Sequence, residues 1–193
     1  VRAGGLKLDG PGYVTVEGYG RTNLDGVWAL GDITPGHALA HRAFEQGITI
    51  AEKIAGADPK PVLDDTVPQV VFSFPEAASV GLTLDQAKAR EDVVEPKEMA
   101  YPMLSNARML MSGEGGSMTV VSGAFANNPD MQVVLGVHIV SPIASDLIAE
   151  AEQLVGNRVP LADAARLIHP HPTFSETLGE ALLKADGRPL HTR

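Results

Sequence analysis

The hydrophobic and polar residues follow three successive patterns over the first 65 positions. Two short β-prone runs, 13–16 and 27–30, each come after an Asp-Gly turn signal and predict strands. From Ala38 onward, apolar side chains recur every three or four positions up to Gly56, which predicts a helix over residues 38–55. Residues 57–65 then carry two prolines and three aspartates, a composition typical of a linker.

The pattern beyond this linker predicts both strands and helices. Thr83 and Gln86 have the spacing of a capping box, and Ser141-Pro142 has the residue order of a helix start. Residues 126–130 have the composition of a hairpin loop. We therefore predict strands near 67–74, 107–111, 117–125 and 132–140, and helices near 84–90, 142–155, 160–167 and 172–184. The predicted fold is α+β, an antiparallel sheet with flanking helices.

Charge and composition exclude several classes of protein. The chain has 24 acidic and 15 basic side chains, and a net charge of −9 would repel a phosphate backbone, so we expect no nucleic-acid partner. No apolar run reaches the roughly 18 residues of a membrane span, so we expect no membrane partner. The chain contains no cysteine and therefore no thiolate chemistry of its own. Because it starts at Val1 without a methionine or a signal peptide, we expect a piece of a longer protein.

Asp32 and the start of the helix at Ala40 are the first candidate ligand contacts. Asp32 directly follows the predicted buried strand 27–30, a place where open α/β sheets bind ligands. Its carboxylate can accept hydrogen bonds from a ligand hydroxyl, and the free N–H groups of a helix start suit an electron-rich group. The alternative is that Gly31-Asp32 is only a turn.

His171 is the second candidate, because histidine is the usual acid–base group near neutral pH. It lies between two prolines, and Glu176 follows at a distance from which its carboxylate can orient the ring and stabilise its cation. The alternative is that Thr173 to Glu176 is a capping box and Glu176 only bonds the helix start. His169 and His171 lack a convergent set of further ligands, so we predict no metal site. His138 fits a packed histidine in a sheet.

Five segments resemble the flavin-dependent pyridine nucleotide-disulfide oxidoreductases, most closely the dihydrolipoamide dehydrogenase branch. Arg21 to Asp32 is similar to the second FAD-binding signature of this family, and His171 to Glu176 matches its active-site motif. The other similar segments are Leu39 to Ala43, Pro68 to Thr83, and Leu135 to Val140 followed by Ala144 to Ala151. Each segment alone is a weak signal, but the five occur in the right order and spacing.

The resemblance implies roles for individual residues. Asp32 would bind a ribityl or ribose-side hydroxyl of FAD, and the N–H of Ala40 would face the flavin pyrimidine oxygen. His171 would be the acid–base catalyst for the substrate dithiol, and Glu176 would hold its imidazole. In this family the histidine acts on the flavin and the disulfide of the other subunit, so dimerisation builds the active site.

The resemblance also implies a domain organisation and an activity. Residues 1–60 would be the C-terminal, strand-helix part of the FAD-binding α/β domain, and residues 66–193 the dimerisation domain. The parent enzyme would be a cytoplasmic homodimer that oxidises dihydrolipoamide with NAD and meets the lipoyl domain of 2-oxo acid dehydrogenase complexes. Because the redox cysteines and the N-terminal dinucleotide site are absent, we expect this chain alone to be inactive. The alternatives are a fragment of a glutathione-reductase-like enzyme and a non-catalytic dimerisation module.

Overall fold

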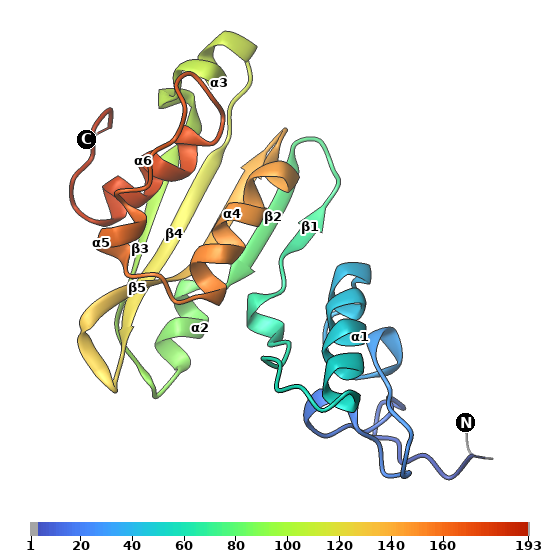
Figure 1. The fold of residues 1–193 in the computed structure, drawn as a ribbon. Helices are drawn as coiled ribbons and strands as arrows, with labels where there is room; N and C mark the ends of the chain where they lie inside the picture. The colour runs from blue at the N-terminus through green and yellow to red at the C-terminus, as the bar shows by residue number, and fades with distance from the viewer. Residues whose placement is uncertain (1–3, 193) are drawn as a thin grey trace. The chain divides into compact units, whose positions relative to one another are not determined.

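The computed structural model describes residues 4–192, and the chain divides into two compact units between Val67 and Pro68. The first unit is built around α1, Ala40–Ile54, with short 3-10 turns at Gly18–Gly20, Gly31–Ile33 and Asp64–Thr66 (Figure 1). The predicted helix over 38–55 is therefore confirmed.

The two faces of α1 differ from what its apolar pattern suggests. Arg42, Thr49 and Ile50 are buried against the rest of the first unit. Phe44 and Ile48, which belong to the apolar stripe that predicted the helix, are 71% and 54% exposed. The stripe thus indicates the helix correctly, but it does not form the core of this unit.

The predicted strands 13–16 and 27–30 are wrong for the described residues of this unit. Val14 and Trp28 each form a single bridge, to Leu8 and Arg21 respectively. The N–H of Val14 instead donates to the Ile33 carbonyl. Because each segment meets different neighbours along its length, its hydrogen bonds do not form a continuous ladder.

The second unit is a five-stranded antiparallel sheet in the order β1-β2-β5-β4-β3. Its strands are β1 Gln69–Val71, β2 Glu76–Gly81, β3 Val93–Pro102, β4 Ser117–Phe125 and β5 Asn128–Ser141. A tight turn joins β4 to β5, so the predicted hairpin is confirmed, although β5 begins earlier than expected. The predicted α+β fold is confirmed.

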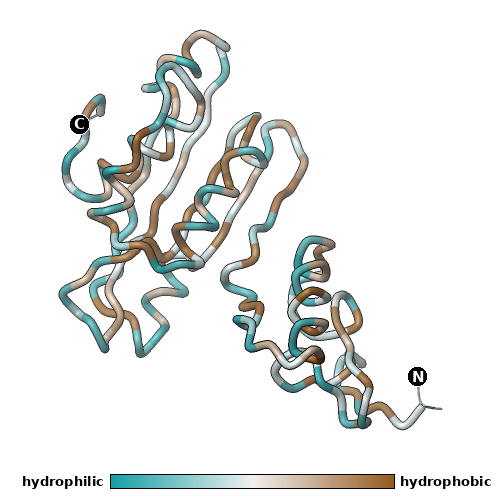
Figure 2. Tube along the Cα trace, viewed as in Figure 1, coloured by the Kyte–Doolittle hydropathy of each residue, from teal (hydrophilic) through white to brown (hydrophobic). Residues whose placement is uncertain are grey.

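The helices of the second unit are α2 Leu84–Ala89, α3 Ala107–Ser112, α4 Ala144–Gly156, α5 Leu161–Ala164 and α6 Glu176–Ala185. Helices α4 and α6 lie on one face of the sheet (Figure 1). Figure 2 shows hydrophobic and hydrophilic residues alternating along α4, as expected for a helix with one buried side. The main core consists of side chains from both layers, among them Val80, Tyr101, Met118, Val120, Val137, Ile139, Leu147, Ile148, Ala151, Leu178 and Leu182.

Three details of the second unit correct the sequence predictions. Residues 107–111 form α3 and not a strand, because the Asn106 side chain accepts the Met109 N–H and caps a helix there. Strands β2 and β3 were not predicted as separate elements. Ser141 belongs to β5, and the residue before α4 is Ile143, so Ser141 does not begin this helix.

A hydrogen bond connects the first turn of α4 to β2. The Ser145 N–H donates to the Glu76 carboxylate from β2, and this hydrogen bond holds the pKa of Glu76 below its usual value.

Candidate functional site

The loop between α5 and α6 brings His171 and Glu176 together. Nδ1 of His171 lies 2.8 Å from Oε1 of Glu176, the first residue of α6. Because an ionised carboxylate only accepts, Nδ1 carries the hydrogen of this bond, and in the neutral ring the lone pair is on Nε2. The His171 side chain is 70% exposed, whereas the Glu176 side chain is 19% exposed. The arrangement is an accessible imidazole held by a sheltered carboxylate.

The second oxygen of Glu176 also has a partner. Oε2 accepts the Thr173 N–H at 2.8 Å, which is one half of a capping box. In a complete capping box the Thr173 hydroxyl would also accept the Glu176 N–H. Here the Thr173 hydroxyl instead donates to the Pro170 carbonyl at 2.6 Å and lies 2.9 Å from the Ser175 hydroxyl. Glu176 therefore makes both contacts that the sequence left as alternatives.

The contacts of Glu176 fix its charge. Partial burial favours the neutral acid and raises the pKa of its carboxyl, but the hydrogen bonds from the Thr173 amide and from His171 act in the opposite direction. Together with the positive charges that His171 and His169 can carry, they hold the pKa of Glu176 below its usual value. Glu176 is thus a carboxylate at neutral pH, the state that best accepts from an imidazole N–H.

A second histidine–glutamate pair lies beside the first and was not predicted from the sequence. Nε2 of His169 lies 2.8 Å from Oε1 of Glu150 in α4. The His169 side chain is 8% exposed, so it is a buried histidine with a satisfied partner. Nothing in the local sequence signals this pair, because its partners are 19 residues apart and belong to different elements. Across residues 4–192, no group of three or more His, Cys, Asp or Glu side chains could hold a metal ion.

Asp32 and Ala40 lie in the first unit, at either end of the loop before α1. Asp32 is an exposed residue of the 3-10 turn Gly31–Ile33, and Ala40 is the exposed first residue of α1. Gly31 has a φ of +68°, and a Cβ there would lie 3.2 Å from Cβ of Ala43, so the turn packs directly on the helix. The Gly31 N–H donates to the Gln46 side chain of α1 at 2.8 Å.

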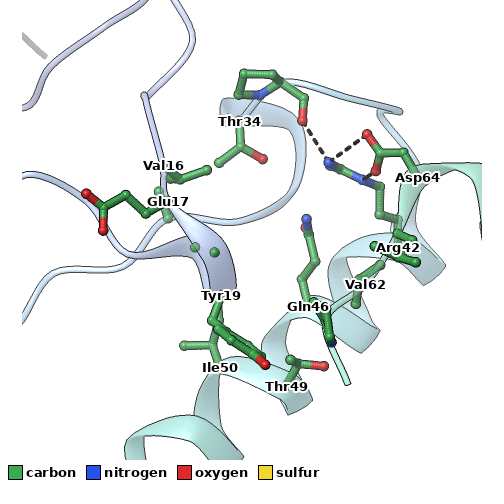
Figure 3. Close-up of a pocket in the computed structure, with 16 residues that line it drawn as sticks. Val16, Glu17, Tyr19, Thr34, Arg42, Gln46, Thr49, Ile50, Val62 and Asp64 are labelled. Carbon is green, nitrogen blue, oxygen red and sulfur yellow. Dashed lines mark hydrogen bonds and ion pairs between the residues drawn. The ribbon is translucent and has the colours of Figure 1, made fainter. Parts of the chain in front are cut away.

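The first unit also contains a pocket of about 330 Å³ beside α1. Figure 3 shows Arg42 at one end of it, where the guanidinium donates to the Pro35 carbonyl and to the Asp64 carboxylate. Arg42 is 5% exposed, and Nε lies 2.7 Å from Oδ1 of Asp64. These contacts connect the segment before α1, at Pro35, to the segment after α1, at Asp64. The prediction of a linker over residues 57–65 did not include such contacts.

Comparisons with known proteins place this chain in a family. The model of the pyridine nucleotide-disulphide oxidoreductase dimerisation domain matches residues 67–182, and the pyridine nucleotide-disulphide oxidoreductase model matches residues 1–47. Dihydrolipoyl dehydrogenase of Cupriavidus necator is 40% identical over 189 residues, which are 97% of this chain and 38% of the relative. Dihydrolipoyl dehydrogenase of Bacillus subtilis is 38% identical over 181 residues, which are 93% of this chain and 37% of the relative.

A solved structure shows the same fold. LpdA from Mycobacterium tuberculosis is 30% identical and superposes with a TM-score of 0.83 over 94% of this chain and 38% of that protein. The chain therefore spans less than two-fifths of the length of these relatives. In the described residues, no helix has the length and apolar content needed to cross a membrane. The chain belongs to the pyridine nucleotide-disulphide oxidoreductase family and includes its dimerisation domain.

Proposed function

We propose that this chain is part of a dihydrolipoamide dehydrogenase, in which it supplies the acid–base histidine and the dimer interface. The full-length enzyme oxidises dihydrolipoamide with NAD, through FAD and a redox-active cysteine pair that lies outside this chain. Its macromolecular partner is the lipoyl domain of a 2-oxo acid dehydrogenase complex. The observation that carries the proposal is the hydrogen-bonded pair of His171 and Glu176, found in a chain whose similar relatives are dihydrolipoyl dehydrogenases.

His171 acts as the base toward the substrate dithiol. Nε2, the nitrogen that does not face Glu176, takes a proton from one substrate thiol as its sulfur attacks the enzyme disulfide. A substrate–enzyme sulfur bond forms, the enzyme disulfide bond breaks, and one enzyme cysteine leaves as a thiolate. The Glu176 carboxylate stabilises the imidazolium that results, and its bond to Nδ1 keeps the ring in the orientation needed.

The residues of the first unit fit a flavin. When bound, FAD would supply the redox chemistry that links the cysteine pair to NAD. The exposed Asp32 carboxylate can accept hydrogen bonds from hydroxyls of its ribityl or ribose side. Ala40 is the first residue of α1, so its N–H has no acceptor within the helix and would be able to face an electron-rich part of the flavin.

The homodimer follows from the role of the second unit. The family model that matches residues 67–182 is a dimerisation domain. His171 is 70% exposed, and this chain contains no cysteine on which it could act. Pairing with a second subunit would bring His171 to the flavin and cysteines of the partner.

The test uses the full-length, FAD-loaded protein with His171→Gln. Turnover of dihydrolipoamide and NAD should fall by about 10²–10⁴-fold, the usual contribution of general acid–base catalysis. Bound FAD per subunit, measured from its absorbance, should stay at the parent level because His171 does not hold the cofactor. Turnover near the parent value in this variant would refute the catalytic assignment. Reduction of glutathione disulfide by NADH or NADPH, without oxidation of dihydrolipoamide by NAD, would refute the proposed substrate.

A further inference from the structure

The imidazole ring of His169 is buried next to the candidate site formed by His171 and Glu176. It is two residues before His171 and is the buried member of the two, with a side chain that is 8% exposed against 70%. Its Nε2 donates to Glu150 of α4 at 2.8 Å. This contact attaches the beginning of the loop 169–175 to a helix that packs on the sheet.

The other side of the His169 ring rests on α6. A Cβ at Gly179 would lie 2.5 Å from Nδ1 of His169, which is closer than any ordinary contact. Alanine is normally favoured over glycine inside a helix by about 1 kcal/mol, so glycine has a packing reason here. The ring is therefore clamped between α4 and α6.

The rest of the loop is short and held at its far end. Prolines at 170 and 172 restrict the backbone on both sides of His171. The Asn106 side chain, which caps α3, donates to the Thr173 carbonyl at 3.1 Å, and the Thr173 N–H bonds Glu176. His171 therefore lies in a loop that is fixed on one side by the contacts of His169 and on the other by the hydrogen bonds of Thr173.

Charge couples the two histidine–glutamate pairs. The hydrogen bond to Glu150 raises the pKa of His169 above its usual value against the opposing effect of burial, and the charge of Glu176 adds to the rise. In return, the positive charge of His169 contributes to the low pKa of Glu176. The order Glu150, His169, Glu176, His171 therefore alternates negative and positive groups.

We propose that His169 is a positioning residue, whose bond to Glu150 and packing on Gly179 fix the loop that carries His171. This inference rests on the proposed role of His171, on which His169 acts through the loop backbone and through Glu176. It assigns no contact with substrate or flavin to His169.

The experiment compares His169→Ala with the parent in the full-length, FAD-loaded enzyme. The first readout is hydrogen exchange of the Thr173 amide, which should become about tenfold faster or more when the anchor is lost, since local opening exposes that amide. Amides of β4 and β5 should keep their protection. The second readout is kcat per bound FAD, which should fall by about tenfold to a hundredfold, because displacing a catalytic group by about 1 Å has this effect. The KM for NAD should not change.

Further variants separate positioning from a general folding defect. In His169→Gln, the amide nitrogen can occupy the place of Nε2 and bond Glu150, so most of the protection and turnover should return. In Gly179→Ala, the added methyl group pushes the ring from the other side, and the loop should open although the helix itself gains propensity. The matched control is His191→Gln, because His191 pairs with Glu180 of the same helix at 2.7 Å but lies outside the loop. This control should match the parent in both readouts.

The outcomes distinguish this inference from the proposed function. Parent-like Thr173 exchange and kcat per FAD in both His169→Ala and Gly179→Ala would overturn the positioning role, even if His171→Gln is inactive. A loss of protection spread over β4 and β5 as well, with kcat per FAD unchanged, would show a purely structural residue and overturn it too. Faster exchange confined to the loop, in an enzyme whose His171→Gln variant is fully active, would refute the role of His171 and leave the anchor itself in place.

Discussion

At the scale of single residues, the two oxygens of Glu176 bind different partners. Oε1 accepts from the His171 ring, and Oε2 accepts from the Thr173 amide. A carboxylate can serve both donors at once because each oxygen has lone pairs and shares the negative charge. The residue that begins α6 is therefore the residue that orients the candidate base.

Glu176→Gln tests this double contact. Glutamine has one acceptor oxygen, so it can accept from Thr173 or from His171, but its NH₂ group cannot accept from the second donor. We expect turnover per bound FAD to fall by about tenfold, since a lost hydrogen bond to a charged group is typically worth this factor. The fall should be smaller than in His171→Gln, because the base itself remains. A silent substitution would mean that Glu176 matters only for the start of the helix, where glutamine is also accepted.

The two histidine pairs show how far residue-level reasoning from sequence extends. The contact of His171 with Glu176 could be predicted, because the two residues are only five positions apart and Glu176 lies in the first turn of a helix. The contact of His169 with Glu150 was not, because it depends on α4 and the loop before α6 lying side by side in the folded unit. The sequence identified the side chains that can carry out acid–base chemistry, but it could not show which of them are buried.

At the scale of elements, local patterns predicted the helices better than the strands. The periodic apolar residues of α1 and α4 predicted both helices, since a helix satisfies its own backbone. Strand β3 was missed because it lies at the edge of the sheet, contains Pro96 and has several charged, exposed positions. A strand depends on its neighbours, and the local sequence does not contain them.

Gly136→Ala tests how closely β2 and β5 approach. Gly136 of β5 pairs with Gly81 of β2, and a Cβ at Gly136 would overlap the carbonyl oxygen of Leu82. Backbone atoms cannot move aside as a side chain can, so the free energy of unfolding should fall by about 1–3 kcal/mol. Urea unfolding followed by circular dichroism measures it. The control is Gly156→Ala at the end of α4, where a Cβ would meet the flexible Glu152 side chain and little should change. Equal stability of both variants would contradict the expected strain.

At the scale of the whole molecule, the residues of the proposed function are divided between the two units. The first unit contains Asp32 and Ala40, the candidate flavin contacts. The second unit contains His171 and its hydrogen-bond partner Glu176. The cysteines that the proposed chemistry needs are absent from the sequence. The proposed activity therefore requires residues beyond this chain together with a second subunit.

We expect some of the exposed apolar side chains of the second unit to contact the second subunit of the proposed homodimer. The residues of α4 and α6 that pack on the sheet are buried within this unit, so they are not available for that contact. Ile168, next to the buried His169, is 96% exposed, and Leu167 is 47% exposed. Leu104, Leu110 and Met111 at and before α3 are 52%, 63% and 61% exposed. Exposed apolar side chains such as these are candidates for a surface that a partner covers.

Ile168→Asp in the full-length, FAD-loaded protein tests this assignment. Burying an isoleucine side chain contributes about 1.5–3 kcal/mol, so replacing it by a carboxylate at a dimer contact should raise the dimer dissociation constant by at least about tenfold. Sedimentation velocity over a dilution series measures this constant. Ile168→Val keeps the residue apolar and should remain close to the parent. Turnover of the aspartate variant should recover at protein concentrations high enough to restore the dimer, because His171 and Glu176 are unchanged. An unchanged dissociation constant would place Ile168 outside the interface.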